Sequence, residues 1–245
     1  MNFFWDTVET VNRTECKGFS HFDTSHIIWL VLFLCVCIWC AWFYRKRTYF
    51  QRSLMRYAVA VLLIADEVMK YWIIHKGGVP VIGYLPLQLC SICIILVIIH
   101  CFVPWNHYIG NFLYLVGLAA GLSALLFPSW TALPAFANLM SIHSFTVHII
   151  LVSYIVMMIC AKEIRPEFKT IPVSVCALIA MAICVFVFDL ISGMNYMYLI
   201  HLSPASPLAP FEALGDYRIG YAIILAGLIF VLYVPPALVR WFSKA

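Results

Sequence analysis

Residues 170–192 read TIPVSVCALIAMAICVFVFDLIS, a stretch in which Asp189 is the only charged residue. A helix rises about 1.5 Å per residue, so about 20 such residues cross a hydrocarbon layer roughly 30 Å thick. Strands are excluded because an open strand leaves its backbone groups unpaired in lipid. Six further stretches share this length and character. We therefore predict seven transmembrane helices, over about 26–44, 54–74, 86–103, 108–127, 139–161, 170–192 and 218–239.

The composition of the whole chain agrees with a membrane protein. Of its 245 residues, 64% are hydrophobic and 11% are charged. Soluble domains keep roughly a quarter of their residues charged, so this chain has too little polar surface to face water. We expect a single integral membrane domain over residues 1–245, an all-α seven-helix bundle. No basic stripe resembles a nucleic-acid-binding surface, so we expect no nucleic-acid partner.

The distribution of Lys and Arg predicts the orientation of the chain. Ten of these residues fall on one side of the predicted helices and four on the other. Because short cytoplasmic segments are rich in Lys and Arg, we predict the N-terminus outside and the C-terminus in the cytoplasm. The ten residues are Arg45, Lys46, Arg47, Arg52, Arg56, Lys162, Arg165, Lys169, Arg240 and Lys244.

Polar residues within the predicted helices gather at one level, near their outer ends. Ionisable groups inside a span cost about 2.5–3.5 kcal/mol each on insertion scales and mark functional cavities. We therefore predict an outward-facing polar site. An alternative is that Asp66 and Lys70, four residues apart, form a structural ion pair, and that Asp189 and Arg218 tie two helices together. The residues at this level are His26, Asp66, Glu67, Lys70, Gln88, Cys90, His143, Ser144, Asp189, Asn195, Tyr196 and Arg218.

Cys90 is the cysteine with candidate chemistry. With Pro86 expected to begin its helix, Cys90 falls in the second turn, where the helix dipole acts only modestly on a thiol. An ordinary thiol, with a pKa of about 8.5, is mostly protonated at neutral pH and needs a base to react. His143, at a similar depth, supplies the second ingredient of a nucleophile–base pair. Cys90 and Cys93 also form a C-x-x-C pattern, so thiol redox chemistry is an alternative.

The histidines give no metal-binding pattern. His143 and His148 are five residues apart, which separates them by about 140° around a helix. They therefore cannot chelate one metal as a pair four residues apart does. No other group of His, Cys and carboxylate residues has ligand spacing, so we expect neither a metal nor another cofactor.

Several motifs, taken in order along the chain, resemble those of the YwaF-like family of bacterial membrane proteins. The most specific is NYMYL at 195–199, which resembles the Asn-Tyr-Met-aromatic-Leu element of that family. PASP at 204–207 follows where the family has Pro-Ala-Asn-Pro, so Ser206 departs from the pattern. The other matches are FS at 19–20 with His26, LPLQLC at 85–90, SIH at 141–143 and EALG at 212–215.

The resemblance carries an implied function. The eukaryotic counterpart of the family is transmembrane protein 164, an acyltransferase acting on ether phospholipids, and a more distant likeness is to androgen-induced membrane hydrolases of fatty-acid esters. The resemblance implies that Cys90 accepts the acyl group, that His143 is its base, and that membrane phospholipids or acyl lipids are the partners. It also makes a bacterial inner membrane the expected location. The predicted substrate-binding residues are Glu67, Lys70, Gln88, Asn195, Tyr196 and Arg218.

A second class of function fits the same residues. Seven helices with an outward polar site also suit a non-enzymatic receptor or transporter for a small polar or lipidic ligand. Against transport, the sequence contains neither an inverted repeat nor a pair of broken helices at mid-membrane. Acyl transfer or lipid-ester hydrolysis is therefore the first hypothesis, and ligand binding is the second.

Overall fold

The computed structural model describes residues 3–11, 15–202 and 208–242, and every regular element within these ranges is helical. The PASP stretch at 204–207 lies outside the described residues. The long elements are α1 (Thr24–Arg45), α2 (Tyr49–Lys76), α3 (Leu89–Phe102), α4 (His107–Phe112), the π-helical turn η3 (Leu113–Gly117), α5 (Leu118–Leu126), α6 (Leu139–Cys160), α7 (Ile171–Ser192) and α8 (Ile219–Phe242). The short 3-10 helices are η1 (Phe3–Trp5), η2 (Val81–Tyr84), η4 (Phe168–Thr170), η5 (Tyr196–Tyr198) and η6 (Ala209–Leu214).

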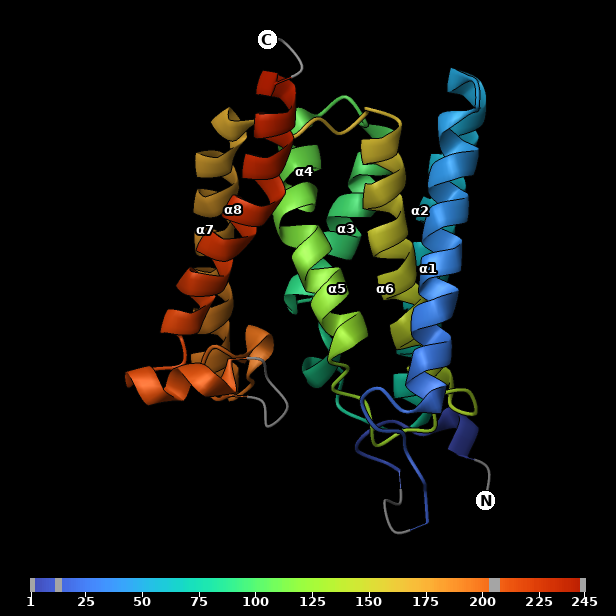
Figure 1. Cartoon of the computed structure of the whole chain (residues 1–245). Coiled ribbons are helices and arrows are strands. Elements are labelled where there is room, and N and C mark those ends of the chain that lie inside the picture. Colours follow the sequence, from blue (N-terminus) through green and yellow to red (C-terminus); the bar gives the residue numbers. More distant parts are fainter. Residues whose placement is uncertain (1–2, 12–14, 203–207, 243–245) are drawn as a thin grey trace.

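Each of the predicted ranges coincides with one helix or, for 108–127, with the continuous rod of α4, η3 and α5. Among the described residues, four segments are long and apolar enough to cross a membrane: α1, the α4–α5 rod, Phe168–Ser192 and α6. The helix α3 and residues Ile219–Val234 form shorter apolar helices. This is the helix content of a multi-pass membrane protein. Seven crossings and an outer N-terminus stay predictions, although the N-terminal segment and the end of α8 lie at opposite ends of the bundle (Figure 1), as an odd number of crossings requires.

Side-chain caps begin several helices where the sequence changes from polar to apolar. The Asp23 carboxylate accepts a hydrogen bond from the His26 backbone N–H at 2.8 Å at the start of α1. The Asn138 side-chain oxygen does the same for Ser141 at the start of α6, at 2.9 Å. Such caps satisfy N–H groups that have no partner within the helix. The cap on α6 fixes the residue at which this helix begins, and with it the positions of the polar residues in its first three turns.

Helix α6 lies in the middle of the bundle, with α1, α2, α3 and α5 packed against it (Figure 1). Of its 22 residues, 14 are buried. The outer helices instead expose large apolar side chains, such as Ile38 of α1 and Ile191 of α7, as lipid-facing helices do. Polar side chains on α6 therefore face protein rather than lipid, which is where intramembrane polar groups act.

Close packing of α5 on α6 depends on Gly121. A Cβ atom at this position would lie 2.6 Å from Cγ2 of Val152. We expect Gly121→Val to lower the free energy of unfolding by about 1–3 kcal/mol, because α5 must then move away from α6. Thermal denaturation in detergent measures this change. Gly227→Val is the matched control on α8, where nothing lies within 4 Å of the added Cβ, and an equal loss in both variants would contradict the prediction.

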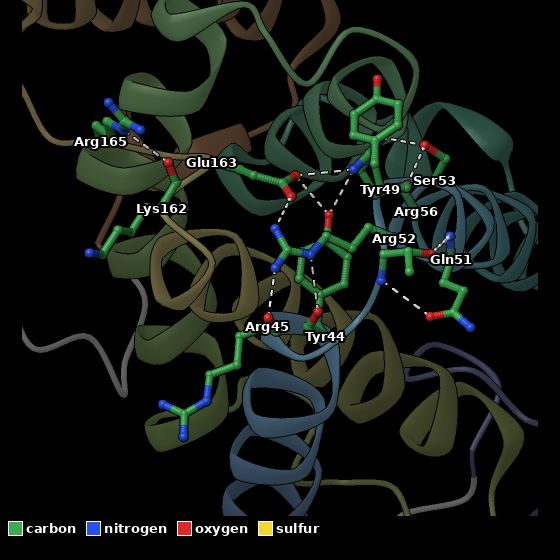
Figure 2. A network of polar contacts seen from close by, with 11 residues as sticks. Tyr44, Arg45, Tyr49, Gln51, Arg52, Ser53, Arg56, Lys162, Glu163 and Arg165 are labelled. Atoms are coloured by element: carbon green, nitrogen blue, oxygen red, sulfur yellow. Dashed lines mark hydrogen bonds and ion pairs between the residues drawn. The ribbon is translucent and has the colours of Figure 1, made fainter.

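At the end of the bundle away from the N-terminal segment, a charged cluster joins three parts of the chain (Figure 2). Glu163, in the loop after α6, accepts hydrogen bonds from Arg52 and Arg56 at 3.0 Å each and from the Tyr44 hydroxyl at 2.8 Å. Arg56 also donates to the Tyr44 hydroxyl at 2.8 Å. Charge counting assigned both arginines to the cytoplasmic segment after the first predicted helix. In the structure they belong to α2, which begins at Tyr49. The cluster ties the end of α1 and the start of α2 to the loop after α6.

Candidate functional site

The candidate site begins at the first turn of α3. This helix starts at Leu89, three residues after Pro86, the residue predicted to begin it. Cys90 is therefore the second residue of the helix and lies in its first turn, not in the predicted second turn. Backbone N–H groups of a first turn have no partner within the helix. Cys90 therefore lies among backbone N–H groups that have no helical partner.

The Cys90 thiol of α3 and the imidazole of His148 of α6 lie close enough to act on each other electrostatically. Nδ1 of His148 lies 2.5 Å from the Ser144 carbonyl oxygen. A carbonyl only accepts, so Nδ1 is the donor, and the neutral ring then carries its lone pair on Nε2. Nε2 has no hydrogen-bond partner in the described part of the chain. This nitrogen is therefore free to take the proton of the thiol.

The ring plane of His148 is fixed by Trp130, from the loop between α5 and α6. The indole stacks on the imidazole with centroids 5.6 Å apart and planes 12° apart. Trp130 also packs edge-on against Phe145 of α6, at 5.4 Å. With the Ser144 hydrogen bond, the stack leaves His148 little freedom to turn away from Cys90.

His143, the predicted base, lies beside two acids of α2. Its Nδ1 is 3.3 Å from the Asp66 carboxylate and its Nε2 is 4.0 Å from Glu67. Glu67 also forms an ion pair with Lys70, so the alternative pairing of Asp66 with Lys70 is wrong. Residues three apart on a helix lie on the same side, which allows this pairing. Glu67 further acts electrostatically on His148. We call these groups the polar cluster: Asp66, Glu67, Lys70, Cys90, His143 and His148.

The other predicted substrate-binding residues lie outside the polar cluster. Gln88, Asn195 and Tyr196 form hydrogen bonds with the backbone of their own chain. Arg218 is exposed and pairs with Asp216 at 2.7 Å. Asp189 is fully buried beside Tyr196, so the alternative tie between Asp189 and Arg218 is not formed. Of the six predicted substrate-binding residues, Glu67 and Lys70 are the two that lie in the polar cluster with Cys90.

The C-x-x-C pair lies along the start of α3. Cys90 and Cys93 are both free, and Cys93 is fully buried one turn further along α3. Among the residues that the structure describes, no group of three His, Cys, Asp or Glu side chains is arranged to hold a metal ion.

The comparisons with known proteins place the chain in a family. The model of the TMEM164 family matches residues 21–234, which include every member of the polar cluster. The chain belongs to the TMEM164 family. The predicted resemblance to transmembrane protein 164 is thereby confirmed, and the YwaF-like label stays a prediction. Neither the curated proteins nor the solved structures gave a match. Membership of the TMEM164 family agrees with the multi-pass arrangement of apolar helices.

His148 is the residue of this TMEM164-family site that the sequence alone did not reveal. Cys90 and His143 were paired from the sequence as nucleophile and base because both were expected near the outer ends of their helices. The helix α3 has only 14 residues, about 21 Å, which is shorter than a hydrocarbon layer of roughly 30 Å. The later start of α3 places Cys90 in its first turn, and the histidine of α6 that acts on Cys90 is His148, five residues beyond the predicted His143.

Proposed function

We propose that this protein is a membrane-embedded lipid acyltransferase or lipid-ester hydrolase, with Cys90 as nucleophile and His148 as base. One observation carries the proposal: the Cys90 thiol lies near the imidazole of His148, whose Nδ1 is bound to the Ser144 carbonyl and whose Nε2 has no hydrogen-bond partner among the described residues. A nucleophile, a base within reach and a third group that orients the base make up the general arrangement for covalent catalysis.

The reaction begins when His148 Nε2 takes the thiol proton and the Cys90 sulfur attacks the carbonyl carbon of a lipid ester. A bond forms between sulfur and carbon, and the carbonyl oxygen becomes an oxyanion. Backbone N–H groups in the first turn of α3 are suited to stabilise this charge. The bond from carbon to the ester oxygen then breaks, and the proton on His148 passes to the departing alcohol. An acyl-cysteine thioester remains.

The second half of the reaction returns the enzyme to its starting state. The hydroxyl of a lysolipid or other alcohol, or a water molecule, gives its proton to His148 and attacks the thioester carbonyl. The carbon–sulfur bond breaks, and the thiol recovers the proton from His148. Transfer and hydrolysis differ only in the acceptor. Lys70 and Glu67, as charged neighbours of the reacting pair, are the residues we propose for contact with a lipid headgroup.

The proposed substrates are membrane phospholipids or other acyl lipids, and the proposed location is the cell membrane. Support comes from the family and from the apolar surfaces of the outer helices, which suit a protein surrounded by lipid. We propose that the lipid presents its ester group to the first turn of α3, which carries Cys90.

The proposal is tested by intact-mass analysis of the purified protein after incubation with phospholipid and a clickable acyl probe. We expect a fatty-acyl adduct that maps to Cys90 and is absent from Cys90→Ser. Cys93→Ser is the matched control, one turn along the same helix, and should keep the adduct. Loss of function in both variants without an adduct would point to thiol redox chemistry instead. An unmodified wild-type protein under turnover conditions contradicts acyl catalysis and leaves ligand binding as the function to test.

A further inference from the structure

The turn Asn195–Tyr198, between α7 and α8, lies against the segment that leads into α3. Tyr196 is buried in this turn, and its hydroxyl accepts a hydrogen bond from the Leu85 backbone N–H at 2.9 Å and donates to the Ile82 carbonyl at 2.5 Å. These partners lie 111 and 114 positions away in the sequence. One hydroxyl therefore fixes two backbone points of the chain just before α3.

A second contact from the same turn reaches the N-cap residue of α3. Gln88 is the N-cap of α3, but its side chain does not cap its own helix. Its side-chain oxygen instead accepts a hydrogen bond from the Met197 backbone N–H at 2.9 Å. Cys90 follows two residues later. The turn after α7 thus holds the start of the helix on which the proposed nucleophile lies.

The turn adopts a conformation that is unfavourable for its residues. Met197 and Tyr198 have φ of 52° and 54°, in the left-handed region that side chains with a Cβ disfavour. Hydroxyls from the start of α8 support both carbonyls: Tyr221 donates to Met197 at 2.7 Å and Tyr217 to Tyr198 at 2.8 Å. The left-handed backbone directs the Met197 N–H toward Gln88. Strained backbone that is held by surrounding contacts gathers at functional sites.

We propose that Tyr196 and Gln88 are positioning residues, which hold the first turn of α3 so that the Cys90 thiol meets His148. The reason is geometric. If the chain of α3 slipped by one residue in register, its side chains would shift by about 1.5 Å along the axis and turn by about 100°. Either change separates the sulfur of α3 from the imidazole of α6. A misplacement of about 1 Å is enough to lower a reaction rate roughly a hundredfold.

The test is the rate at which iodoacetamide alkylates Cys90 in the full-length protein in detergent, followed by peptide mass analysis. This rate depends on the proximity of thiol and imidazole and needs no lipid activity, so a failure of the proposed function and a failure of this proposal are distinguishable. We expect Tyr196→Phe and Gln88→Met to lower the rate roughly ten- to a hundredfold. Gln88→Glu keeps an acceptor for the Met197 N–H and should retain most of the rate. Where acyl transfer is measurable, kcat should fall in the first two variants while KM is unchanged.

Two controls separate positioning from general loosening. Tyr114→Phe removes another buried tyrosine hydroxyl that donates to a backbone carbonyl, that of Leu232, at 2.5 Å. We expect this variant to leave Cys90 alkylation unchanged at a similar melting temperature. The buried Cys93 thiol is the internal reference, and its alkylation should not change. An unchanged or faster alkylation of Cys90 in Tyr196→Phe, or a parallel change at Cys93, would overturn the proposal.

Discussion

Replacing His148 with asparagine is expected to slow formation of the acyl-enzyme by about 100- to 10,000-fold, the usual contribution of a general base. The imidazole lies near the Cys90 thiol with its Nδ1 bound to the Ser144 carbonyl, so Nε2 is the nitrogen left to take the thiol proton. Asparagine keeps a side chain that can bind the Ser144 carbonyl but offers no comparable base. Single-turnover mass analysis with an acyl probe gives the rate directly.

The matched control is His143→Asn, because both variants remove one buried imidazole from α6. His143 lies 3.3 Å from Asp66 and belongs to the polar cluster, but its ring is paired with acids of α2. We expect its replacement to lower the acylation rate less than tenfold, because His148 still serves as the base for the Cys90 thiol. The reverse ranking, with His143→Asn inactive and His148→Asn active, would restore His143 as the base and contradict the assignment made from the structure.

The sequence was sufficient to predict the fold class and the helix positions. Long apolar stretches such as 170–192 have few alternatives to a helix in lipid, and turn residues separate them. Helix α7 accordingly spans Ile171–Ser192, one residue from the predicted start. Membership of the TMEM164 family was also accessible, because its motifs are short runs of neighbouring residues.

The candidate site was only partly predictable, because it depends on the exact start of α3. Proline is common at the first position of a helix, which favours Pro86 as the beginning. The structure instead begins α3 after Gln88, whose partner is the Met197 backbone N–H, 109 residues away. No local pattern reports a contact over that separation. The start of α3 is three residues later than predicted, so Cys90 lies in its first turn, where His148 rather than His143 acts on it.

The NYMYL motif shows a related limit of sequence patterns. A run of Asn, Tyr and Met at the end of a helix suggests side chains for substrate, and Asn195 and Tyr196 were assigned that role. In the structure Asn195 accepts hydrogen bonds from the Ile200 and His201 N–H groups, and Tyr196 holds the segment before α3. A hydroxyl or amide satisfies a backbone group as well as a ligand, and the residue type does not distinguish the two.

The largest effect on stability is expected from Glu163→Gln, in the charged cluster of Figure 2. The Glu163 carboxylate forms ion pairs with Arg52 and Arg56, and Arg56 is only 2% exposed. Removing one partner of a buried ion pair leaves the other charge uncompensated, at a cost of about 3–5 kcal/mol. For a chain of this size that corresponds to a fall in melting temperature of roughly 6–20 °C. Thermal unfolding in detergent, followed by circular dichroism, measures it.

Glu167→Gln is the matched control, because it makes the same change at an exposed position four residues along the same loop, and it should leave the melting temperature nearly unchanged. The physical cause is tested by adding Arg56→Met to Glu163→Gln. If the loss arises from the uncompensated Arg56 charge, an apolar side chain of similar length should recover much of it, since buried ion pairs are often replaced by apolar groups at little cost. Two losses that simply add would instead show that Arg56 and Glu163 contribute independently, because coupled partners depart from additivity.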